Sequence, residues 1–323
     1  MSRHLIVGAG AVGRHTAAAL LDLDPRSEVV LASRSGRGDT VPGVARLAVD
    51  ASDARALTAA ADGYDVVYNC INPPSYDRWE QEWPPMAEAV LAAATSRTLV
   101  TMGNLYVFDE QIRTMSEDTP MRPNGHKGRL RQQMTERALA AHAAGTLRYA
   151  EARASDFFGP GTTTKTSYLT AAILPRARRG KRVIMPVGDV DAPHTWSYVP
   201  DVGRTLATLG TNPDAAGRIW HVPSNPARSP RQVAADVADL VGVRHPKASA
   251  VPWSVVRAAG VAVPFARELA ETRHQFELPY LLDSEKTRRE LGLRPTPWAD
   301  ALRAALAAAD TTDREATADA PAS

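Results

Sequence analysis

The chain has 323 residues, enough for a full hydrophobic core, and its 38 basic and 36 acidic side chains leave a formal net charge of +2. This balance argues against a nucleic-acid partner and against an anionic membrane surface. The single cysteine, Cys70, excludes an internal disulfide framework and a multi-cysteine metal site, so we expect no metal. Since no signal peptide and no membrane-spanning apolar run is evident, we expect a soluble cytoplasmic protein.

The first predicted elements are a strand, a glycine-rich turn and a helix. The strand Arg3 to Val7 leads into the pattern G-x-G-x-x-G, after which Ala and Leu recur at helical spacing up to Leu23. The first glycine allows a tight turn, the second lets backbone N–H groups approach a pyrophosphate, and the third lets the helix pack closely on the strand. The pattern predicts a dinucleotide-binding turn with phosphates at the helix N-terminus. The residues expected to contact the dinucleotide here are Gly8, Gly10, Ala11, Val12 and Gly13.

The second strand indicates which dinucleotide to expect. It runs from Glu28 to Ala32 and ends at Ser33 and Arg34, with Arg37 close behind. Proteins that bind NAD usually have a carboxylate here for the ribose hydroxyls, whereas a guanidinium suits a 2′-phosphate. We therefore predict NADP, bound through Ser33, Arg34 and Arg37. The alternative is that the arginines are solvated loop residues, and it is stronger for Arg37 than for Arg34.

Strands and helices continue to alternate along the chain. Regular alternation predicts right-handed crossovers and a doubly wound parallel sheet, so we assign residues 1–160 to an α/β, Rossmann-type dinucleotide-binding domain. Asp53 is a suitable N-cap for the helix after the third strand. The later strands are expected at Val44 to Val49, Asp65 to Cys70, Thr98 to Met102 and Leu147 to Arg153, and the helices between them should end near Gly63, Ala94 and Ala144.

The loop after the fourth strand is rich in proline and aromatic residues. It runs from Ile71 to Trp79 and is followed by Trp83-Pro84-Pro85, after which we expect the next helix to begin. Ligands bind at the carboxyl ends of strands in open α/β sheets. The aromatic side chains Tyr76 and Trp79 could therefore line a pocket, or they could cap the sheet edge.

The character of the sequence changes near Gly161, where the elements become shorter and are broken by prolines. We expect residues 161–309 to form a smaller substrate lobe with segments that return to the sheet. The tail 310–323 is rich in Ala, Thr and Asp without periodicity, which predicts disorder. The expected helices are Tyr168 to Arg179, Pro200 to Leu209, Arg231 to Val241, Glu285 to Leu291 and Trp298 to Ala308, and the expected strands lie near Val183-Ile184, Thr195-Trp196-Ser197 and Ile219 to Val222.

Short motifs follow one another in a characteristic order between residues 3 and 306. They are the glycine turn, Asp50, Asn69-Cys70-Ile71-Asn72, Asn104-Leu105-Tyr106, the segment Arg153 to Gly161, Val199-Pro200-Asp201-Val202 and the segment Glu290 to Thr296. This series resembles the extended short-chain dehydrogenase/reductase superfamily and, within it, the NAD-dependent epimerase/dehydratase group.

That resemblance implies several contacts with the dinucleotide. Asp50, at the adenine, and Ala51 would contact it, as would the loop of Cys70, Ile71 and Asn72, and Phe157 would border the nicotinamide. The resemblance also suggests a homodimer through the helices after the fourth and fifth strands. The Ala-rich faces of those helices could equally belong to the core.

The catalytic part of the family pattern is absent from this sequence. Family members carry a Ser or Thr after the fifth strand and a Tyr-x-x-x-Lys on the next helix, where the lysine lowers the pKa of the tyrosine. Here that helix begins without a tyrosine, at residues 126–131. Lys127 lies where the proton donor is expected and either supplies the proton or only binds the coenzyme. Arg131 could orient Lys127 or hold the coenzyme, and Thr101 and Asn104 could hydrogen-bond a substrate oxygen.

Two functions are consistent with these residues. The first is an NADP(H)-dependent oxidoreductase, a reductase that acts on a small carbonyl, enone or sugar-like substrate, with Lys127 or a water supplying the proton. The second is a redox-neutral or non-catalytic protein that keeps NADP as structure or as a sensor. Asp156, after the sixth strand, is either a pocket carboxylate or a residue that fixes its loop.

Overall fold

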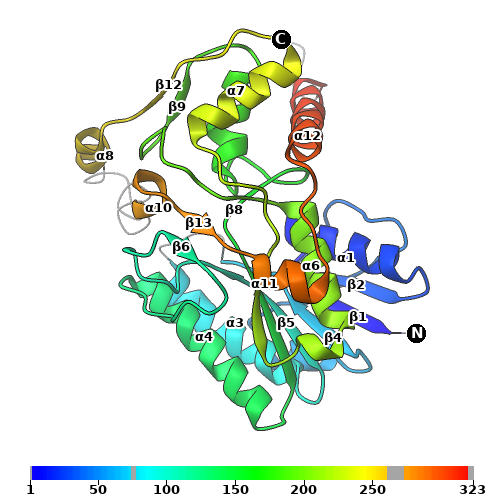
Figure 1. Ribbon diagram of the computed structural model, residues 1–323. Helices are drawn as coiled ribbons and strands as arrows, with labels where there is room; N and C mark the ends of the chain where they lie inside the picture. Colours follow the sequence, from blue (N-terminus) through cyan, green and yellow to red (C-terminus); the bar gives the residue numbers. More distant parts are fainter. Residues whose placement is uncertain (1, 74–77, 260–272, 319–323) are drawn as a thin grey trace. The chain divides into compact units, whose positions relative to one another are not determined.

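The computed structural model describes residues 2–73, 78–259 and 273–318 (Figure 1). The chain divides into two compact units, and we describe each by itself. The first unit consists of Met1–Ala154, Pro200–Pro223 and Asp283–Leu293. The second consists of Ser155–Val199, Ser224–Leu282 and Arg294–Ser323.

The first unit is built on a seven-stranded parallel sheet with the order β3-β2-β1-β4-β5-β7-β11. This confirms the doubly wound Rossmann-type sheet predicted from the sequence. The order reverses between β1 and β4, and open α/β sheets bind ligands at the carboxyl ends of the strands beside such a switch point. The strands are β1 (Arg3–Val7), β2 (Glu28–Ser33), β3 (Ala45–Ala48), β4 (Val66–Asn69), β5 (Thr98–Asn104), β7 (Arg148–Ala154) and β11 (Arg218–His221).

Helices cover both faces of this sheet. On one face, α2, α3 and α4 pack over an apolar cluster that includes Leu5, Val67 and Leu99, and Figure 1 shows α3 and α4 side by side. On the other face, α6 lies against α1, since a Cβ added to Gly203 would stand 2.4 Å from the backbone carbon of His15. The helices are α1 (Ala11–Leu23), α2 (Ala54–Ala60), α3 (Trp79–Ala93), α4 (His126–Ala143) and α6 (Val199–Thr211).

Helix α3 begins earlier than the sequence predicted. We expected it after Trp83-Pro84-Pro85, but it starts at Trp79 and contains both prolines. Prolines inside a helix remove backbone hydrogen bonds and cost roughly 3 kcal/mol. Trp79 and Trp83 lie one turn apart on the buried face of α3, and burial of the two indoles offsets that loss.

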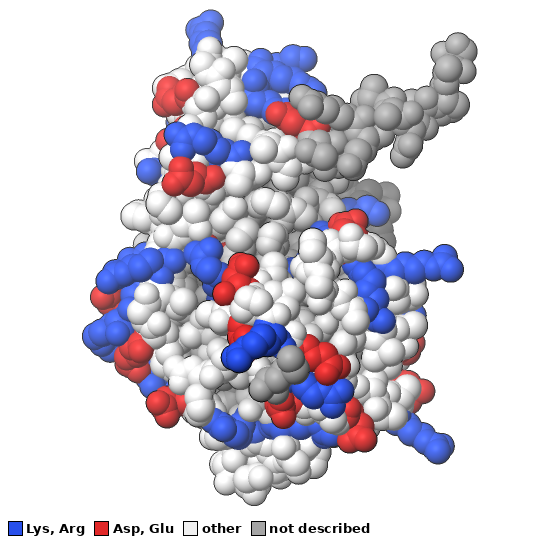
Figure 2. Space-filling model, turned by 90° about the vertical axis from the view of Figure 1, so that its right-hand side faces the viewer, with Lys and Arg blue, Asp and Glu red and all other residues white. Residues whose placement is uncertain are grey.

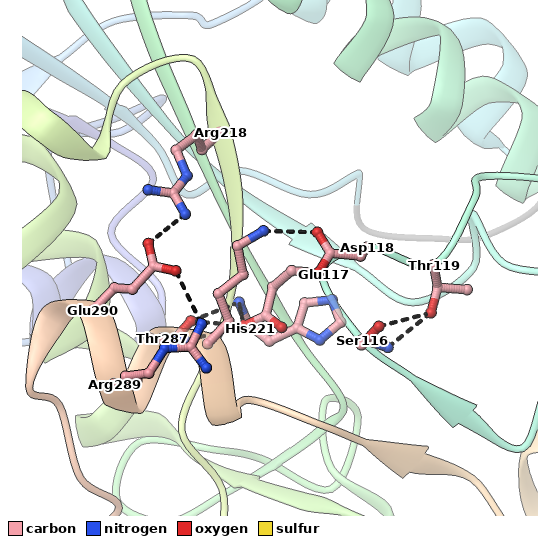
Figure 3. A network of polar contacts seen from close by, with 10 residues as sticks. Ser116, Glu117, Asp118, Thr119, Arg218, His221, Thr287, Arg289 and Glu290 are labelled. Atoms are coloured by element: carbon pink, nitrogen blue, oxygen red, sulfur yellow. Dashed lines mark hydrogen bonds and ion pairs between the residues drawn. The ribbon is translucent and has the colours of Figure 1, made fainter.

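A short helix, α11 (Glu285–Leu291), returns to the first unit from the C-terminal part of the chain. The carboxylate of Glu117, in the turn after β6 (Thr114–Met115), accepts hydrogen bonds from the backbone N–H (3.3 Å) and hydroxyl (2.9 Å) of Thr287 in the first turn of α11 (Figure 3). Lys286 donates to Asp118 at 2.7 Å. Glu117 thereby satisfies a helix N-terminus that its own N-cap residue leaves without a side-chain bond.

The second unit contains two small parallel pairs, β8 with β10 and β9 with β12, packed against helices around a separate apolar cluster. The first helix of this unit changes from a π-helix to an α-helix at Leu174, just before Pro175, whose nitrogen cannot donate a hydrogen bond. Its elements are β8 (Asp156–Phe158), η2 (Leu169–Ile173), α5 (Leu174–Ala177), β9 (Val183–Met185), β10 (Trp196–Tyr198), α7 (Pro230–Val241), β12 (Ala248–Ala250), α8 (Trp253–Ala259), α10 (His274–Glu277), β13 (Leu281–Leu282) and α12 (Trp298–Ala318).

The last helix is longer than predicted. The sequence predicted disorder from residue 310, but α12 continues to Ala318, and residues 319–323 lie outside the described part of the chain. Once a helix is formed, each further residue adds a hydrogen bond at a small entropic cost. Polar residues such as those from 310 to 318 can therefore continue a helix that is already formed. Asp310 also forms an ion pair with Arg178 near the end of α5.

Basic and acidic side chains lie close together on the surface. Figure 2 shows them mixed over the face that it presents, in keeping with the balanced composition. Within residues 2–73, 78–259 and 273–318, no helix combines the length and the apolar character that crossing a bilayer requires.

Candidate functional site

The glycine turn after β1 has the geometry that the sequence predicted. Gly8 has a φ of +113°, and a Cβ there would lie 2.6 Å from the carbonyl oxygen of Cys70. A Cβ on Gly13 would lie 1.9 Å from the carbonyl oxygen of Gly8. These two glycines are required by close backbone contacts within the protein. Gly10 is different, because no atom lies within 4 Å of the position that its Cβ would occupy.

The first turn of α1 is open beside Gly10. Gly10 is the N-cap residue and makes no side-chain capping bond, so the N–H groups that begin the helix at Ala11 and Val12 have no cap from it. A helix N-terminus attracts anions through these N–H groups and through the helix dipole. The turn therefore offers phosphate-binding donors beside the open face of Gly10.

The carboxyl end of β2 carries hydrogen-bonding and cationic groups. Ser33 Oγ is buried and has no hydrogen-bond partner among the described residues, and the next residue, Arg34, is exposed. Arg46 Nη1 donates to the carbonyl oxygen of Arg37 at 3.1 Å, while its Nη2 is buried without a partner in the described part of the chain. Arg14, in the first turn of α1, forms an ion pair with exposed Asp39. The sequence analysis missed both residues. Arg14 directly follows the glycine turn in the sequence, whereas Arg46 comes beside β2 only through the pairing of β3 with that strand.

Three further residues predicted to contact the dinucleotide, Asp50, Ala51 and Cys70, follow β3 and β4 at the carboxyl edge of the sheet. Ser52 donates its N–H (2.9 Å) and its hydroxyl (2.8 Å) to the Asp50 carboxylate, and these bonds, aided by the Arg34 charge, lower the pKa of Asp50. Ala51 packs against the apolar cluster of the sheet. Cys70 follows β4, where its N–H donates to the carbonyl oxygen of Val7 at 2.8 Å. Burial raises the pKa of the Cys70 thiol to about 12.

Helix α4 buries the predicted catalytic residues on one face. Lys127 is 1% exposed and Arg131 is 7% exposed, one turn apart. Gly128 lies between them, and a Cβ there would stand 2.1 Å from the carbonyl oxygen of Tyr106. The glycine thus lets the segment after β5 approach α4 closely. The same segment holds Asn104, whose Oδ1 accepts from the Tyr106 N–H at 3.1 Å.

Arg131 connects α4 to the loop after β4. Its Nη2 donates to Asn72 Oδ1 at 3.1 Å, and Asn72 Nδ2 donates to the carbonyl oxygen of Pro73 at 3.0 Å. Ile71, between Cys70 and Asn72, packs against the sheet cluster. The structure thus joins Arg131, predicted to orient Lys127 or hold the coenzyme, to a residue of the predicted coenzyme loop. Tyr76, which we considered as a pocket residue, lies outside the described residues.

A buried polar network lies next to these residues on β7. The Glu151 carboxylate receives hydrogen bonds from Arg153 Nε, Tyr149 Oη and Thr135 Oγ1, each at 2.7 Å. Burial alone would raise the pKa of Glu151. The charge of Arg153 and the hydrogen bonds from Arg153, Thr135 and Tyr149 hold this pKa below its ordinary value. Thr101, a predicted substrate ligand, lies beside this network, where its side chain interacts with Tyr149.

A cavity of about 30 Å³ lies between the sheet and helices α3 and α4. That volume is enough for roughly two water molecules. The cavity brings three predicted catalytic residues, Thr101, Asn104 and Arg131, together with Glu151, which sequence analysis missed. The missed signal was the alternation of Tyr149, Glu151 and Arg153, since residues two apart share one face of a strand.

The remaining site residues belong to the second unit. Phe157 lies in β8, which pairs with β10. Its neighbour Asp156 accepts from His194 Nε2 at 2.7 Å, while His194 Nδ1 lies 3.0 Å from the carbonyl oxygen of Gln275. His194 is buried, with its ring stacked on Phe276. Of the two roles considered for Asp156, these contacts favour fixation of its loop.

The sequence of residues 4–222 matches the NAD-dependent epimerase/dehydratase family. The chain belongs to this family. No curated protein matches the sequence.

Solved structures of sugar-nucleotide enzymes share the fold of this family member over nearly its full length. dTDP-glucose 4,6-dehydratase from Bacillus anthracis str. Ames, in complex with NAD, has a TM-score of 0.74 and 14% identity, over 97% of this chain and 98% of that one. UDP-glucose 4-epimerase from Thermotoga maritima, with UDP-glucose, has a TM-score of 0.75 and 13% identity, over 96% and 99%. The Streptomyces venezuelae dTDP-glucose 4,6-dehydratase DesIV has values of 0.72 and 20%, over 97% and 98%. At these identities the likeness shows the fold.

The switch point of this epimerase/dehydratase family member fits a nicotinamide dinucleotide. Gly10 leaves an open approach to the helix N-terminus, and Ser33 Oγ is a buried hydroxyl that lacks a partner among the described residues. A pyrophosphate would occupy the first of these positions and a ribose the second. The match to the family and the geometry of the turn therefore agree on the class of coenzyme.

Proposed function

We propose that this protein is an NADP(H)-dependent oxidoreductase that reduces a small carbonyl, enone or sugar-like substrate. The observation that carries the choice of NADP is the end of β2, where Ser33 and Arg34 stand in place of a carboxylate. An acidic side chain there would accept hydrogen bonds from the ribose hydroxyls of NAD, and it would repel a 2′-phosphate.

The charges around this position support a phosphate ligand. Burial and the nearby Arg46 guanidinium lower the pKa of Arg14, which nevertheless stays charged because an arginine does not deprotonate in a protein. Arg46 also keeps a buried N–H without a partner in the described residues. Two guanidinium groups that repel each other are stabilised by an anion beside them, a role that the exposed carboxylate of Asp39 has at Arg14 and that a 2′-phosphate would share.

In this proposal the coenzyme supplies a hydride to the carbonyl carbon, and a proton must reach the carbonyl oxygen. Lys127 is our candidate for the proton donor because it lies at the start of α4, where the family pattern places tyrosine, and is buried. Its ammonium would give up one proton and recover it from solvent after product release. Asn104 would hydrogen-bond the substrate oxygen during the transfer.

Calorimetric titration with NADP⁺ and NAD⁺ tests the choice of coenzyme. We expect NADP⁺ to bind more tightly, and Arg34→Ala to weaken NADP⁺ about tenfold or more while leaving NAD⁺ unchanged, since a hydrogen bond to a charged group contributes about 1.5–3 kcal/mol. Arg55→Ala, which removes an exposed arginine of α2, is the matched control. Tighter binding of NAD⁺ would overturn the assignment of NADP.

A redox-neutral or non-catalytic NADP-binding protein is the second candidate. The observation that favours it is the pair Lys127 and Arg131 where the family carries tyrosine and lysine. NADPH absorbance in the presence of candidate carbonyl substrates separates the two. The reductase predicts consumption of NADPH that Lys127→Ala abolishes without loss of NADP⁺ binding. No consumption by the wild-type protein with any candidate favours the second function.

A further inference from the structure

The guanidinium of Arg131 lies in the corner between two indole rings. Its Cζ is 4.2 Å from the ring centroid of Trp83 and 5.1 Å from that of Trp79. The two rings meet edge to face, with centroids 6.1 Å apart and planes at 88°, and both side chains are buried. A cation over an indole face is attracted by the ring's electrons, most strongly where water is excluded. We call Trp79 and Trp83 the indole corner.

The indole corner leaves the edge of the guanidinium available for hydrogen bonds. Arg131 Nη2 uses that edge to donate to Asn72 Oδ1 at 3.1 Å. Asn72 lies in the loop after β4, at the carboxyl edge of the sheet beside the switch point. The two indoles of α3 thus contact the faces of the Arg131 guanidinium. Its edge donates a hydrogen bond to the predicted coenzyme loop.

This arrangement explains why an arginine stands at residue 131. A planar guanidinium contacts aromatic faces and forms in-plane hydrogen bonds at the same time, whereas the lysine ammonium is a compact charge on a flexible chain. The start of α3 at Trp79, despite Pro84 and Pro85, is what brings both indoles to the arginine. The indoles and Arg131 therefore form one structural unit that links α3, α4 and the loop after β4.

We propose that Trp79 and Trp83 are positioning residues that orient Arg131 for the nicotinamide half of the coenzyme. This inference rests on the proposed NADP binding. The adenosine 2′-phosphate would bind elsewhere on the carboxyl edge of the sheet, at the end of β2. Loss of the indole corner should therefore weaken binding of the whole coenzyme and spare binding of its adenosine half.

The test compares NADP⁺ with adenosine 2′,5′-bisphosphate, which lacks the nicotinamide half, by calorimetric titration. We expect Trp83→Leu to weaken NADP⁺ about tenfold, the size of a buried cation–π contact, with no change for the bisphosphate. Trp83→Phe, which keeps an aromatic face, should restore most of the affinity. Trp220→Leu is the matched control, because Trp220 is also buried in the first unit with Arg218 at 4.2 Å from its ring.

If Trp83→Leu does not fold, Arg131→Lys provides a second test. It keeps the positive charge, and it should show the same selective loss. In the double variant Trp83→Leu/Arg131→Lys the effects should not add, because both changes disrupt one contact. Equal weakening of both ligands, or unchanged NADP⁺ affinity in Trp83→Leu and Arg131→Lys, overturns the positioning role. If the wild-type protein binds the bisphosphate but these variants bind NADP⁺ normally, the NADP site stands and only this inference fails. If the wild-type protein binds neither ligand, the proposed function fails as well.

Discussion

Glu151 and Arg153 form an ion pair inside the first unit, 2.7 Å from carboxylate oxygen to Nε, with side chains only 3% and 2% exposed. They lie two residues apart on β7 and share the face that α4 covers through Thr135. Gly103 makes room for the pair because it has no side chain. A Cβ at this position would stand 2.3 Å from Glu151 Oε1. Through Thr135, the pair joins β7 to the helix that carries Lys127.

We predict that Glu151→Gln destabilises the protein by about 3 kcal/mol, because it leaves Arg153 as a buried charge without its counter-ion. Chemical denaturation at neutral pH measures this loss. Glu28→Gln is the control, because Glu28 pairs with Arg3 at the exposed surface, where such bridges contribute little. Equal midpoints for the two variants would contradict the buried pair.

The same pair predicts how stability responds to acid. The pKa of Glu151 is lower in the folded protein than in the unfolded chain, so its contribution is complete above the unfolded carboxyl value and is lost as pH falls through the folded value. We expect Glu151→Gln to have a flatter stability curve than the wild type below about pH 4. Denaturation midpoints across that range provide the measurement, and parallel curves would exclude the effect.

Two glycines of the turn after β1 should respond in opposite ways to alanine. A Cβ on Gly13 meets the Gly8 carbonyl, a backbone atom, so we predict that Gly13→Ala destabilises the fold by about 3 kcal/mol. Gly10 has a φ of −73° and open space at its Cβ, so Gly10→Ala should keep the melting temperature of the wild type. It should lose coenzyme affinity about tenfold or more, because its methyl group occupies the approach of the pyrophosphate. Normal NADP⁺ binding by folded Gly10→Ala would argue against this turn as the phosphate site.

The fold was predictable from local signals that agree with one another. The glycine turn predicted the first strand, turn and helix, and the structure has Asp53 as the N-cap of α2, with its carboxylate accepting from the Ala56 N–H at 2.9 Å. Parallel strands buried on both faces are continuous apolar runs, which made β4 recognisable. Such signals need only neighbouring residues, and they therefore survive in a single sequence.

The candidate site was only partly predictable because several of its contacts join distant segments. Prolines argued against the early start of α3, and only the packing of Trp79 and Trp83 on Arg131 overrides that local preference. Glu151 reads as an ordinary polar residue until β7 is placed beneath α4. Ion pairs and cation–π contacts of this kind depend on tertiary structure, which no local pattern encodes.

His221 should make the protein less stable in mild acid. Burial and, to a smaller extent, the charge of Arg153 lower the pKa of His221 from 6.5 to about 4, even though its Nδ1 donates to the Asp283 carbonyl at 2.8 Å. Between these two values the unfolded chain binds a proton that the folded protein does not, so stability falls as pH decreases and the fall ends near pH 4.

We predict that His221 contributes a loss of about 3 kcal/mol across this window, and that His221→Phe flattens the slope although it is less stable at neutral pH. The flatter slope follows because phenylalanine binds no proton in either state. Denaturation at several pH values measures it, with exposed His245→Gln as the control. A slope that follows His245 rather than His221 would refute the assignment.

Cys70 should be nearly inert in the folded protein. Thiol reagents attack the thiolate, and a pKa of about 12 leaves almost none of it at pH 8. We predict that 5,5′-dithiobis(2-nitrobenzoic acid) labels the native protein at least about a hundredfold more slowly than the unfolded chain, where the thiol has its ordinary pKa of about 8.5. Because this is the single cysteine, the absorbance change reports it alone.

Labelling of Cys70 also tests the position of the coenzyme. The loop after β4 lies against the glycine turn, so a coenzyme bound at that turn would lie beside Cys70. A bound coenzyme shields the thiol from the reagent and stabilises the folded form in proportion to its saturation, so NADP⁺ should slow the labelling further. Adenosine 2′,5′-bisphosphate, at equal saturation, should slow it less if the nicotinamide half contacts this loop. Labelling that NADP⁺ leaves unchanged would place the coenzyme away from Cys70.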